Sequence, residues 1–102
     1  MCGIWGAVNL ADEHLAELAA QAMRHRGPDD YGIYVNREPV PVSLVNARLS
    51  IIDLSEAAHQ PLVNEDGRYW IVYNGEVFNF QPLRQVLEEA GHRFRSHSDT
   101  EV

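Results

Sequence analysis

The sequence of 102 residues contains no lysine, one cysteine and no long apolar run. The single thiol, Cys2, excludes an intramolecular disulfide and every metal site built from several cysteines. No apolar stretch approaches the roughly 20 residues that a helix needs to cross a bilayer. The short apolar run at 4–10 also lacks the charged start of a signal peptide. We therefore expect a cytoplasmic protein that makes no membrane contact.

Positive charge is also scarce, because eight arginines stand against fifteen acidic residues and give a net charge of −7. The arginines form no basic stripe, which argues against a nucleic-acid surface. The five histidines lack metal-site spacing and the glycines form no phosphate-binding loop, so we expect no metal and no cofactor in this chain. With 45% hydrophobic residues, the chain has enough apolar material for one small globular domain.

Hydrophobic periodicity predicts two helices and several short strands. The helices are expected at 12–23, with Asp12 as the N-terminal cap, and at 80–90, with Asn79 as the cap. One hairpin is expected from strands at 32–36 and 42–49, and a second from strands at 62–64 and 69–73, where Asp66-Gly67 supplies the turn. A first core strand is expected at 4–9, and a further short strand at 93–95.

The position of the only thiol raises a chemical question. If Met1 is removed, Cys2 carries both a nucleophilic thiol and a free α-amine, whose pKa of about 7.7 to 8.0 lets it act as a base near neutral pH. One residue would then supply two catalytic groups. The alternative is a small buried hydrophobic residue at the start of a strand, which is the commoner role for a cysteine taken alone.

Six short motifs follow one another along the chain. They are Met-Cys-Gly-Ile-Trp-Gly at 1–6, Arg-Gly-Pro-Asp-Asp at 26–30, Arg-Leu-Ser-Ile-Ile-Asp at 48–53, His-Gln-Pro at 59–61, Tyr-Asn-Gly-Glu at 73–76 and Ser-Asp-Thr-Glu at 98–101. In this order they resemble the class II glutamine amidotransferases, and in particular the glutaminase domain of glutamine-hydrolysing asparagine synthetases. The resemblance covers the whole chain.

The resemblance implies a catalytic role for three residues. In that family the N-terminal cysteine attacks the side-chain amide of glutamine, releases ammonia and leaves a glutamyl thioester that water hydrolyses; Cys2 matches this nucleophile. Asn74 and Gly75 match the oxyanion hole, which the asparagine side chain and the glycine N–H form together. Taken singly, an Asn-Gly pair is more often only a tight turn.

The resemblance also implies a glutamine site. Arg48 matches the residue that holds the α-carboxylate, while Glu76 and Asp99 match positions around the α-ammonium. Taken singly, an arginine is more often a surface residue, and these acids are more often solvated. The binding loop of the family further implies contacts from Leu49, Ser50, Ile51 and Ile52. The motif at 26–29 matches a loop that lies near the nucleophile and shapes the site.

The fold implied by the resemblance is α+β, an N-terminal nucleophile hydrolase. This is a four-layer αββα sandwich with mostly antiparallel sheets, and the chain reads as its truncated first half. Residues 1–102 would then be a partial type-2 glutamine amidotransferase domain without the synthetase domain that binds ATP and magnesium. Exposed strand edges in such a fragment predict that it is marginally stable, prone to aggregate or assembled into a homo-oligomer.

The expected activity is hydrolysis of L-glutamine, with the ammonia used for ATP-dependent asparagine synthesis by the synthetase domain of the parent chain. Two alternatives stay open. The chain could be an inactive, truncated domain that acts as a binding or structural module, or the glutaminase part of an amidotransferase with another ammonia acceptor.

Overall fold

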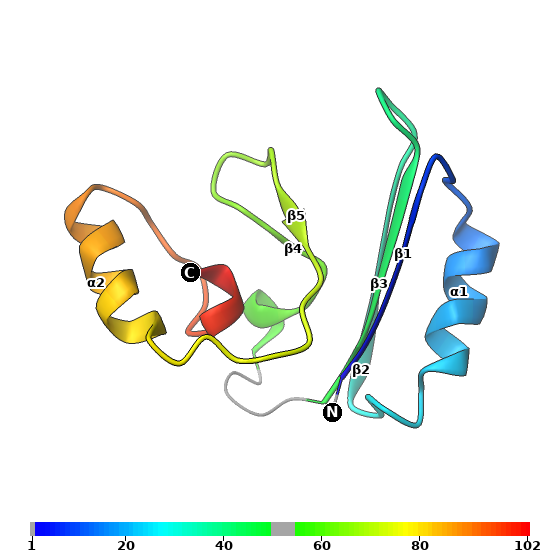
Figure 1. Ribbon diagram of the computed structural model, residues 1–102, viewed down its shortest axis with the longest axis horizontal. Helices are drawn as coiled ribbons and strands as arrows, with labels where there is room; N and C mark the ends of the chain where they lie inside the picture. The colour runs from blue at the N-terminus through cyan, green and yellow to red at the C-terminus, as the bar shows by residue number, and fades with distance from the viewer. Residues whose placement is uncertain (1, 50–54) are drawn as a thin grey trace.

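The computed structural model describes residues 2–49 and 55–102 of the chain. Its elements stack in four layers, with helix α1 on one side and helix α2 on the other (Figure 1). Between them lie a three-stranded antiparallel sheet and a two-stranded antiparallel sheet. The predicted α+β class with antiparallel sheets is therefore confirmed.

The bounds of the elements follow in chain order. They are β1 Gly3–Val8, α1 Glu13–Ala22, β2 Asp30–Asn36, β3 Val42–Arg48, the 3₁₀ turn η1 Glu56–Ala58, β4 Leu62–Val63, β5 Trp70–Ile71, α2 Phe80–Glu89 and the 3₁₀ turn η2 Asp99–Glu101. Neither α-helix in the described part of the chain is long and apolar enough to cross a membrane.

The three-stranded sheet has the order β1-β3-β2, so β3 pairs with a strand on each side. Side chains alternate between the two faces of a strand. Val45 and Ala47 are fully buried on the face that packs against α1. Asn46 and Arg48 therefore belong to the opposite face, which is turned toward the second sheet. That second face carries Arg48, one of the predicted site residues.

The hydrophobic core lies between the three-stranded sheet and α1. It is formed by Ala16 and Ala20 of the helix and Val45 of β3, with Trp5 and Met23 packed at its border. Small residues on the helix let it lie close to the sheet. Asp12 caps the helix as predicted, because its side chain accepts a hydrogen bond from the backbone N–H of Leu15 at 2.9 Å.

An ion pair links α1 to the β2–β3 hairpin and predicts a pH effect. Arg37 donates two hydrogen bonds of 2.7 Å to Glu13, and this contact lowers the pKa of Glu13 from 4.5 to about 2. A carboxyl whose pKa is lowered by folding stabilises the fold above its unfolded pKa, and the contribution disappears as the pH falls toward about 2. The effect should be small, because both side chains are mostly exposed. Urea unfolding at pH 6 and pH 2.5 should show that Glu13→Gln differs from the wild type much more at the higher pH.

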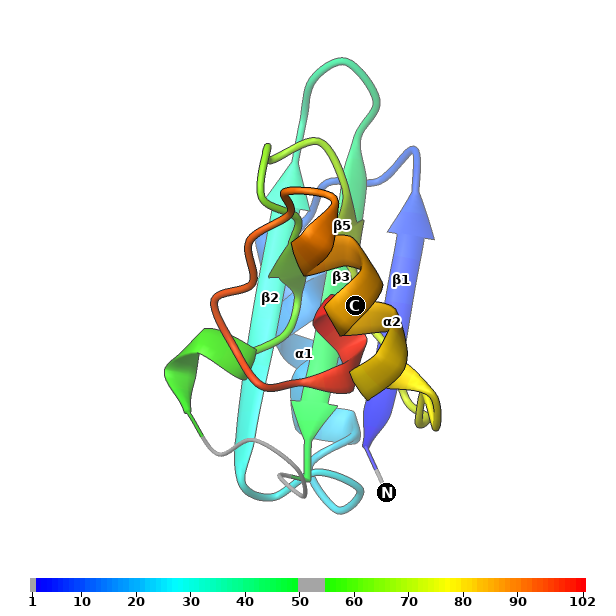
Figure 2. The ribbon, with the colours of Figure 1, turned by 90° about the vertical axis from the view of Figure 1, so that its left-hand side faces the viewer.

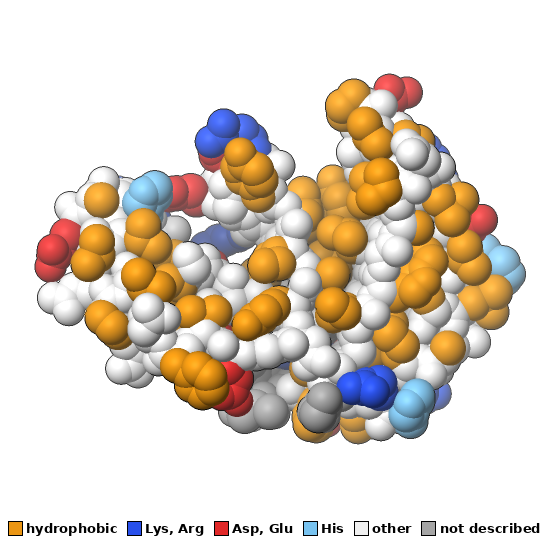
Figure 3. All heavy atoms as spheres, in the orientation of Figure 1, with side chains coloured by type: hydrophobic (Ala, Val, Ile, Leu, Met, Phe, Trp, Pro, Cys, Tyr) orange, Lys and Arg blue, Asp and Glu red, His pale blue; other side chains and the backbone are white. Residues whose placement is uncertain are grey.

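The second half of the chain packs more loosely than the first. None of the residues of α2 is buried, and Phe78 just before it is 89% exposed. The predicted apolar face of this helix is therefore present in the sequence but largely exposed, and hydrophobic side chains are visible over this part of the surface (Figure 3). The helix is held to the following segment by Arg84, which donates to the carbonyl of Ser96 at 2.6 Å and lies over the ring of Phe94.

Two local predictions are corrected. Residues 93–95 form no strand, because the backbone N–H groups of Arg93 and Arg95 bond to the carboxylates of Glu65 and Glu101, at 3.2 and 2.7 Å. Asn79 occupies the N-cap position of α2, but its side chain makes no capping hydrogen bond.

Candidate active site

The thiol of Cys2 lies against the backbone that continues β3. The N–H of Leu49 donates to Cys2 Sγ at 3.2 Å, and the thiol is 3.5 Å from the carbonyl oxygen of the same residue. Cys2 immediately precedes β1, which pairs along its length with β3. The sheet register therefore brings the thiol beside a residue 47 positions away in the sequence. An N–H that donates to sulfur stabilises negative charge on it, as a nucleophilic thiolate requires.

The loop between α1 and β2 contacts both the cysteine and the end of β3. Arg26 Nε donates to the carbonyl oxygen of Cys2 at 3.4 Å, and the N–H of Asp29 donates to the carbonyl oxygen of Arg48 at 3.1 Å. Gly27 is buried here, and a Cβ at this position would lie 2.2 Å from the carbonyl carbon of Ala47. These contacts place the loop 26–29 beside Cys2 and the end of β3.

Arg48 ends β3 on the face opposite the α1 core. It is half-buried, and its guanidinium Nη1 lies 3.4 Å from the carbonyl oxygen of Ser55, to which it donates. Arg48 and the residue that contacts the thiol, Leu49, are consecutive. The geometry therefore joins two of the predicted site residues, Cys2 and Arg48, at one end of the sheet.

The predicted oxyanion turn lies in the loop between β5 and α2. Asn74, Gly75 and Glu76 are all exposed. The loop folds back on itself, because the hydroxyl of Tyr73 donates to the carbonyl oxygen of Glu76 at 3.4 Å. A Cβ on Gly75 would lie 2.6 Å from that hydroxyl oxygen, so a larger residue at this position would require the Tyr73 ring to shift.

Asp99 is buried, with only 5% of its surface exposed, and its placement is fixed from two directions. Its Oδ2 accepts a hydrogen bond of 2.7 Å from the N–H of Val77, which directly follows the predicted oxyanion turn. The turn that carries Asp99 is closed by Glu101, whose carboxylate accepts from the N–H groups of Arg95 and Ser96 at 2.7 and 2.8 Å. The structure thus brings Asp99 next to the 73–77 loop.

The predicted site residues consequently form two groups. Cys2, Arg48 and Leu49 lie at the end of β3, whereas Asn74, Gly75, Glu76 and Asp99 belong to the segments around α2 and η2. The start of β1 and the loop that precedes α2 lie toward the same end of the molecule in both ribbon views (Figures 1 and 2). The predicted contacts of Ser50, Ile51 and Ile52 lie outside the described residues.

One residue joins the two groups, and no functional role was predicted for it. Gln60 makes hydrogen bonds to Asn46 on β3, to Tyr73 and to Thr100. The signal was present in the sequence, because Gln60 is the central residue of the His-Gln-Pro motif. Its partners could not be read from the motif, since each lies at least 13 residues away along the chain.

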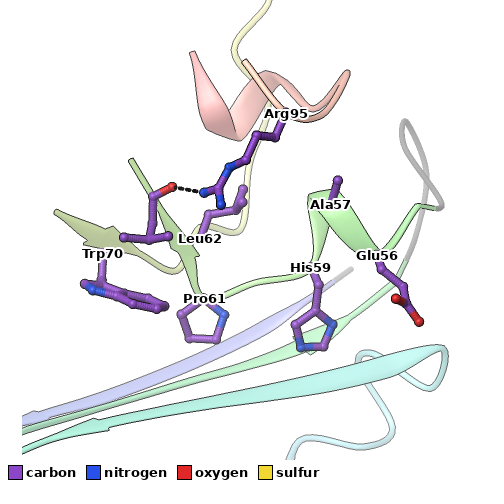
Figure 4. Close-up of a pocket in the computed structure, with 8 residues that line it drawn as sticks. Glu56, Ala57, His59, Pro61, Leu62, Trp70 and Arg95 are labelled. Carbon is purple, nitrogen blue, oxygen red and sulfur yellow. Dashed lines mark hydrogen bonds between the residues drawn. The ribbon is translucent and has the colours of Figure 1, made fainter. Parts of the chain in front are cut away.

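A cavity of about 260 Å³ lies elsewhere, beside the β4–β5 hairpin (Figure 4). His59, Pro61 and Trp70 line one side, and Arg95 lies opposite, where its side chain donates to the carbonyl oxygen of Val63 at 2.9 Å. None of the predicted site residues lines this cavity. Within residues 2–49 and 55–102, no group of three or more histidine, cysteine, aspartate or glutamate side chains could hold a metal ion.

The whole chain, residues 1–102, matches the family described as a glutamine amidotransferase domain, and the chain belongs to this family. It is 45% identical over its full length to glutamine-hydrolysing asparagine synthetase 1 of Bacillus subtilis, of which it covers 17%. It is 40% identical over 99% of its length to a probable glutamine-hydrolysing asparagine synthetase of Dictyostelium discoideum, of which it covers 18%. It is 37% identical over its full length to glutamine-hydrolysing asparagine synthetase 1 of Arabidopsis thaliana, of which it covers 17%. The chain therefore spans less than a fifth of the length of these relatives.

Proposed function

We propose that this chain carries the glutamine-hydrolysing centre of a glutamine amidotransferase, with Cys2 as the nucleophile. The observation that carries the proposal is the position of the thiol. The only cysteine of the chain receives a hydrogen bond from the N–H of Leu49 and lies beside Arg48, a cation suited to the carboxylate of an amino acid. Membership of the glutamine amidotransferase domain family supports the same substrate class.

The proposed reaction needs a free α-amine on Cys2 and hence loss of Met1. The amine takes the thiol proton while Sγ bonds to the side-chain carbonyl carbon of glutamine. Collapse of the tetrahedral intermediate breaks the C–N bond, and the ammonium group returns its proton to the leaving nitrogen, so that ammonia departs. Water then attacks the thioester, the C–S bond breaks, and glutamate leaves with the thiol restored.

The other predicted residues have roles that fit the charges of the substrate. Asn74 and Gly75 would donate to the oxyanion of both tetrahedral intermediates. Arg48 would hold the α-carboxylate, and Glu76 and Asp99 would face the α-ammonium. In the structure, Oδ2 of Asp99 accepts a hydrogen bond from the N–H of Val77. A carboxylate can accept further hydrogen bonds at its second oxygen, as contact with an α-ammonium would require. Leu49, Ser50, Ile51 and Ile52 would border the substrate.

The names of the relatives support a proposal for the longer protein. We infer that residues 1–102 are part of a type-2 glutamine amidotransferase domain, joined in the parent chain to a synthetase domain that uses ATP and magnesium. Ammonia from this site would then serve asparagine synthesis in the cytoplasm. No residue of this chain is assigned to ATP or to a metal, and assembly into a homo-oligomer is proposed from the exposed edges of β1 and β2.

The direct test is hydrolysis of glutamine by the protein as its gene encodes it. We expect equal amounts of glutamate and ammonia, measured together with the intact mass of the N-terminus to establish that Met1 is lost. Glutamine binding without turnover, in a folded protein that begins at Cys2, would contradict the proposal and favour a binding module.

A substitution at Arg48 tests the substrate site separately from the chemistry. Loss of a charge-assisted pair with the α-carboxylate should cost about 2 kcal/mol of binding, which corresponds to roughly a 30-fold rise in KM for glutamine. Arg48→Ala should therefore raise KM far more than it lowers kcat. Arg93→Ala, which removes an exposed arginine near the C-terminus, serves as the matched control and should leave KM unchanged.

A further inference from the structure

The side chain of Gln60 connects three separate parts of the chain. Its Oε1 accepts from the side-chain amide of Asn46 at 3.1 Å and from the backbone N–H of Tyr73 at 2.7 Å. Its Nε2 donates to the hydroxyl of Thr100 at 3.4 Å. Asn46 lies two residues before Arg48 on the same face of β3, and Thr100 directly follows Asp99. Each contact of Gln60 is therefore one or two residues away from a predicted site residue.

The loop that carries Asn74 and Gly75 is held at both ends by side chains from outside it. Gln60 accepts from the N–H of Tyr73 at the start, and Asp99 accepts from the N–H of Val77 at the end, at 2.7 Å in both cases. Within the loop itself, the hydroxyl of Tyr73 donates to the carbonyl oxygen of Glu76. The position of the turn relative to β3 consequently depends on the amide of Gln60.

We propose that Gln60 is a positioning residue for the oxyanion turn. It would act through the backbone of Tyr73 and would not touch the substrate. The role requires an oxygen that accepts two hydrogen bonds at once, which a glutamine or glutamate side chain can supply and an apolar side chain cannot. An oxyanion donor must stay within a few tenths of an ångström of its place to stabilise the transition state. This inference rests on the proposed glutamine hydrolysis, of which it names a further participant.

A general structural role must be separated from this one. Asn46 is buried, and its Oδ1 has no partner among the described residues. Loss of the Gln60 side chain would remove the acceptor for the Asn46 amide nitrogen and for the N–H of Tyr73, and an unpaired buried donor is costly. Some loss of stability is therefore expected from either role. Rates must be expressed per folded molecule, with the folded fraction of each variant taken from its urea unfolding curve, so that unfolded protein does not contribute.

The first experiment compares three variants in the protein as its gene encodes it. Gln60→Leu should lower kcat for glutamine hydrolysis about tenfold and raise KM by a smaller factor, because Arg48 and Asp99 remain in place while the loop that carries Glu76 is displaced. Gln60→Glu keeps the accepting oxygen and should restore kcat to within about threefold of the wild type. Gln85→Leu, on the exposed side of α2, is the matched control and should leave both constants unchanged. A kcat per folded molecule that is unchanged in Gln60→Leu would overturn the proposal.

The second experiment is a double-mutant cycle with Asn74→Ala. If Gln60 acts by positioning the turn, Gln60→Leu should lower kcat by clearly less than tenfold once the Asn74 side chain is gone, because only the contribution of the Gly75 N–H then remains to be disturbed. If the two effects multiply in full, Gln60 acts independently of the turn and the proposal is wrong.

A third measurement does not depend on activity. Amide hydrogen exchange at Tyr73 should be at least about tenfold faster in Gln60→Leu than in Gln60→Glu or the wild type, whereas exchange in α1 should be the same in all three. If the wild type hydrolyses no glutamine, the proposed function fails, and exchange at Tyr73 still decides whether Gln60 holds this loop. Equal exchange at Tyr73 in the three proteins would overturn the positioning role.

Discussion

Replacement of Cys2 by serine should lower glutamine hydrolysis at least about a thousandfold, because loss of a covalent nucleophile removes the whole reaction path through the acyl intermediate. Serine is nearly isosteric, so the contact with the backbone of Leu49 can persist with an oxygen in place of sulfur. Glutamine should still bind with an affinity close to that of the wild type, since Arg48 and Asp99 are unchanged. Turnover and equilibrium binding, measured on the same preparation, separate these two expectations.

The same residue offers a control that leaves the thiol intact. A cleavable N-terminal extension keeps Cys2 inside the chain and removes its α-amine as a free base. We expect the extended protein to be inactive and expect cleavage directly before Cys2 to restore turnover. Activity in the extended protein would show that the amine is not the base. Retention of more than about a tenth of the wild-type rate by Cys2→Ser would show that another group is the nucleophile.

The strands and helix of the first half were predictable because their patterns are local. Strands β1, β2 and β3 and helix α1 begin and end within two residues of the predicted ranges. The apolar periodicity in each was continuous, and Asp12 stands directly before the first turn of the helix. The pairing of β2 with β3 was predicted as a hairpin, whereas the pairing of β1 with β3 was beyond this reasoning, because it joins residues far apart in the sequence.

In the second half of the chain, two predicted strand segments have backbone N–H groups that bond to side chains and not to a neighbouring strand. A strand was predicted at 69–73, but β5 ends at Ile71, and the N–H of Tyr73 bonds to the side chain of Gln60 instead of a neighbouring strand. A strand was also predicted at 93–95, yet carboxylates of Glu65 and Glu101 accept from the N–H groups of this segment. Local patterns cannot reveal such a competitor for the backbone, because the competing side chain comes from another part of the chain.

For the candidate site, ordered motifs selected the residues but not their contacts. Arg48, Asp99 and the Asn74-Gly75 pair were chosen because of the resemblance, and nothing in their spacing indicated which backbone groups hold them. The hydrogen bonds from Leu49 to the thiol and from Val77 to Asp99 follow from the fold alone. Gln60 was visible in its motif but received no role for the same reason.

Gly32 gives the sharpest stability prediction, because it lies where the two halves of the molecule meet. This residue is buried in β2, and a Cβ built on it would lie 1.8 Å from the carbonyl oxygen of Gln60 and 2.6 Å from Nε2 of His59. The carbonyl belongs to the backbone and cannot rotate away as a flexible side chain would. Alanine at position 32 should therefore force the segment 59–60 off the sheet.

We expect Gly32→Ala to lower the free energy of unfolding by about 3 kcal/mol, at the upper end of the usual cost of overpacking. Urea unfolding measures this as a lower midpoint. The matched control is Gly6→Ala in β1, where the nearest atom is the flexible Cδ2 of Leu44 at 3.3 Å. Gly6→Ala should change the free energy of unfolding by no more than about 1 kcal/mol. The side chain of Leu44 can shift, and alanine loses less backbone entropy than glycine when a strand forms. Equal midpoints for the two variants would mean that the segment around Gln60 does not pack on β2 as described.

Displacement of this segment would also move Gln60, which accepts the hydrogen bond from the N–H of Tyr73. Gly32→Ala should therefore lower kcat for glutamine hydrolysis as well as stability.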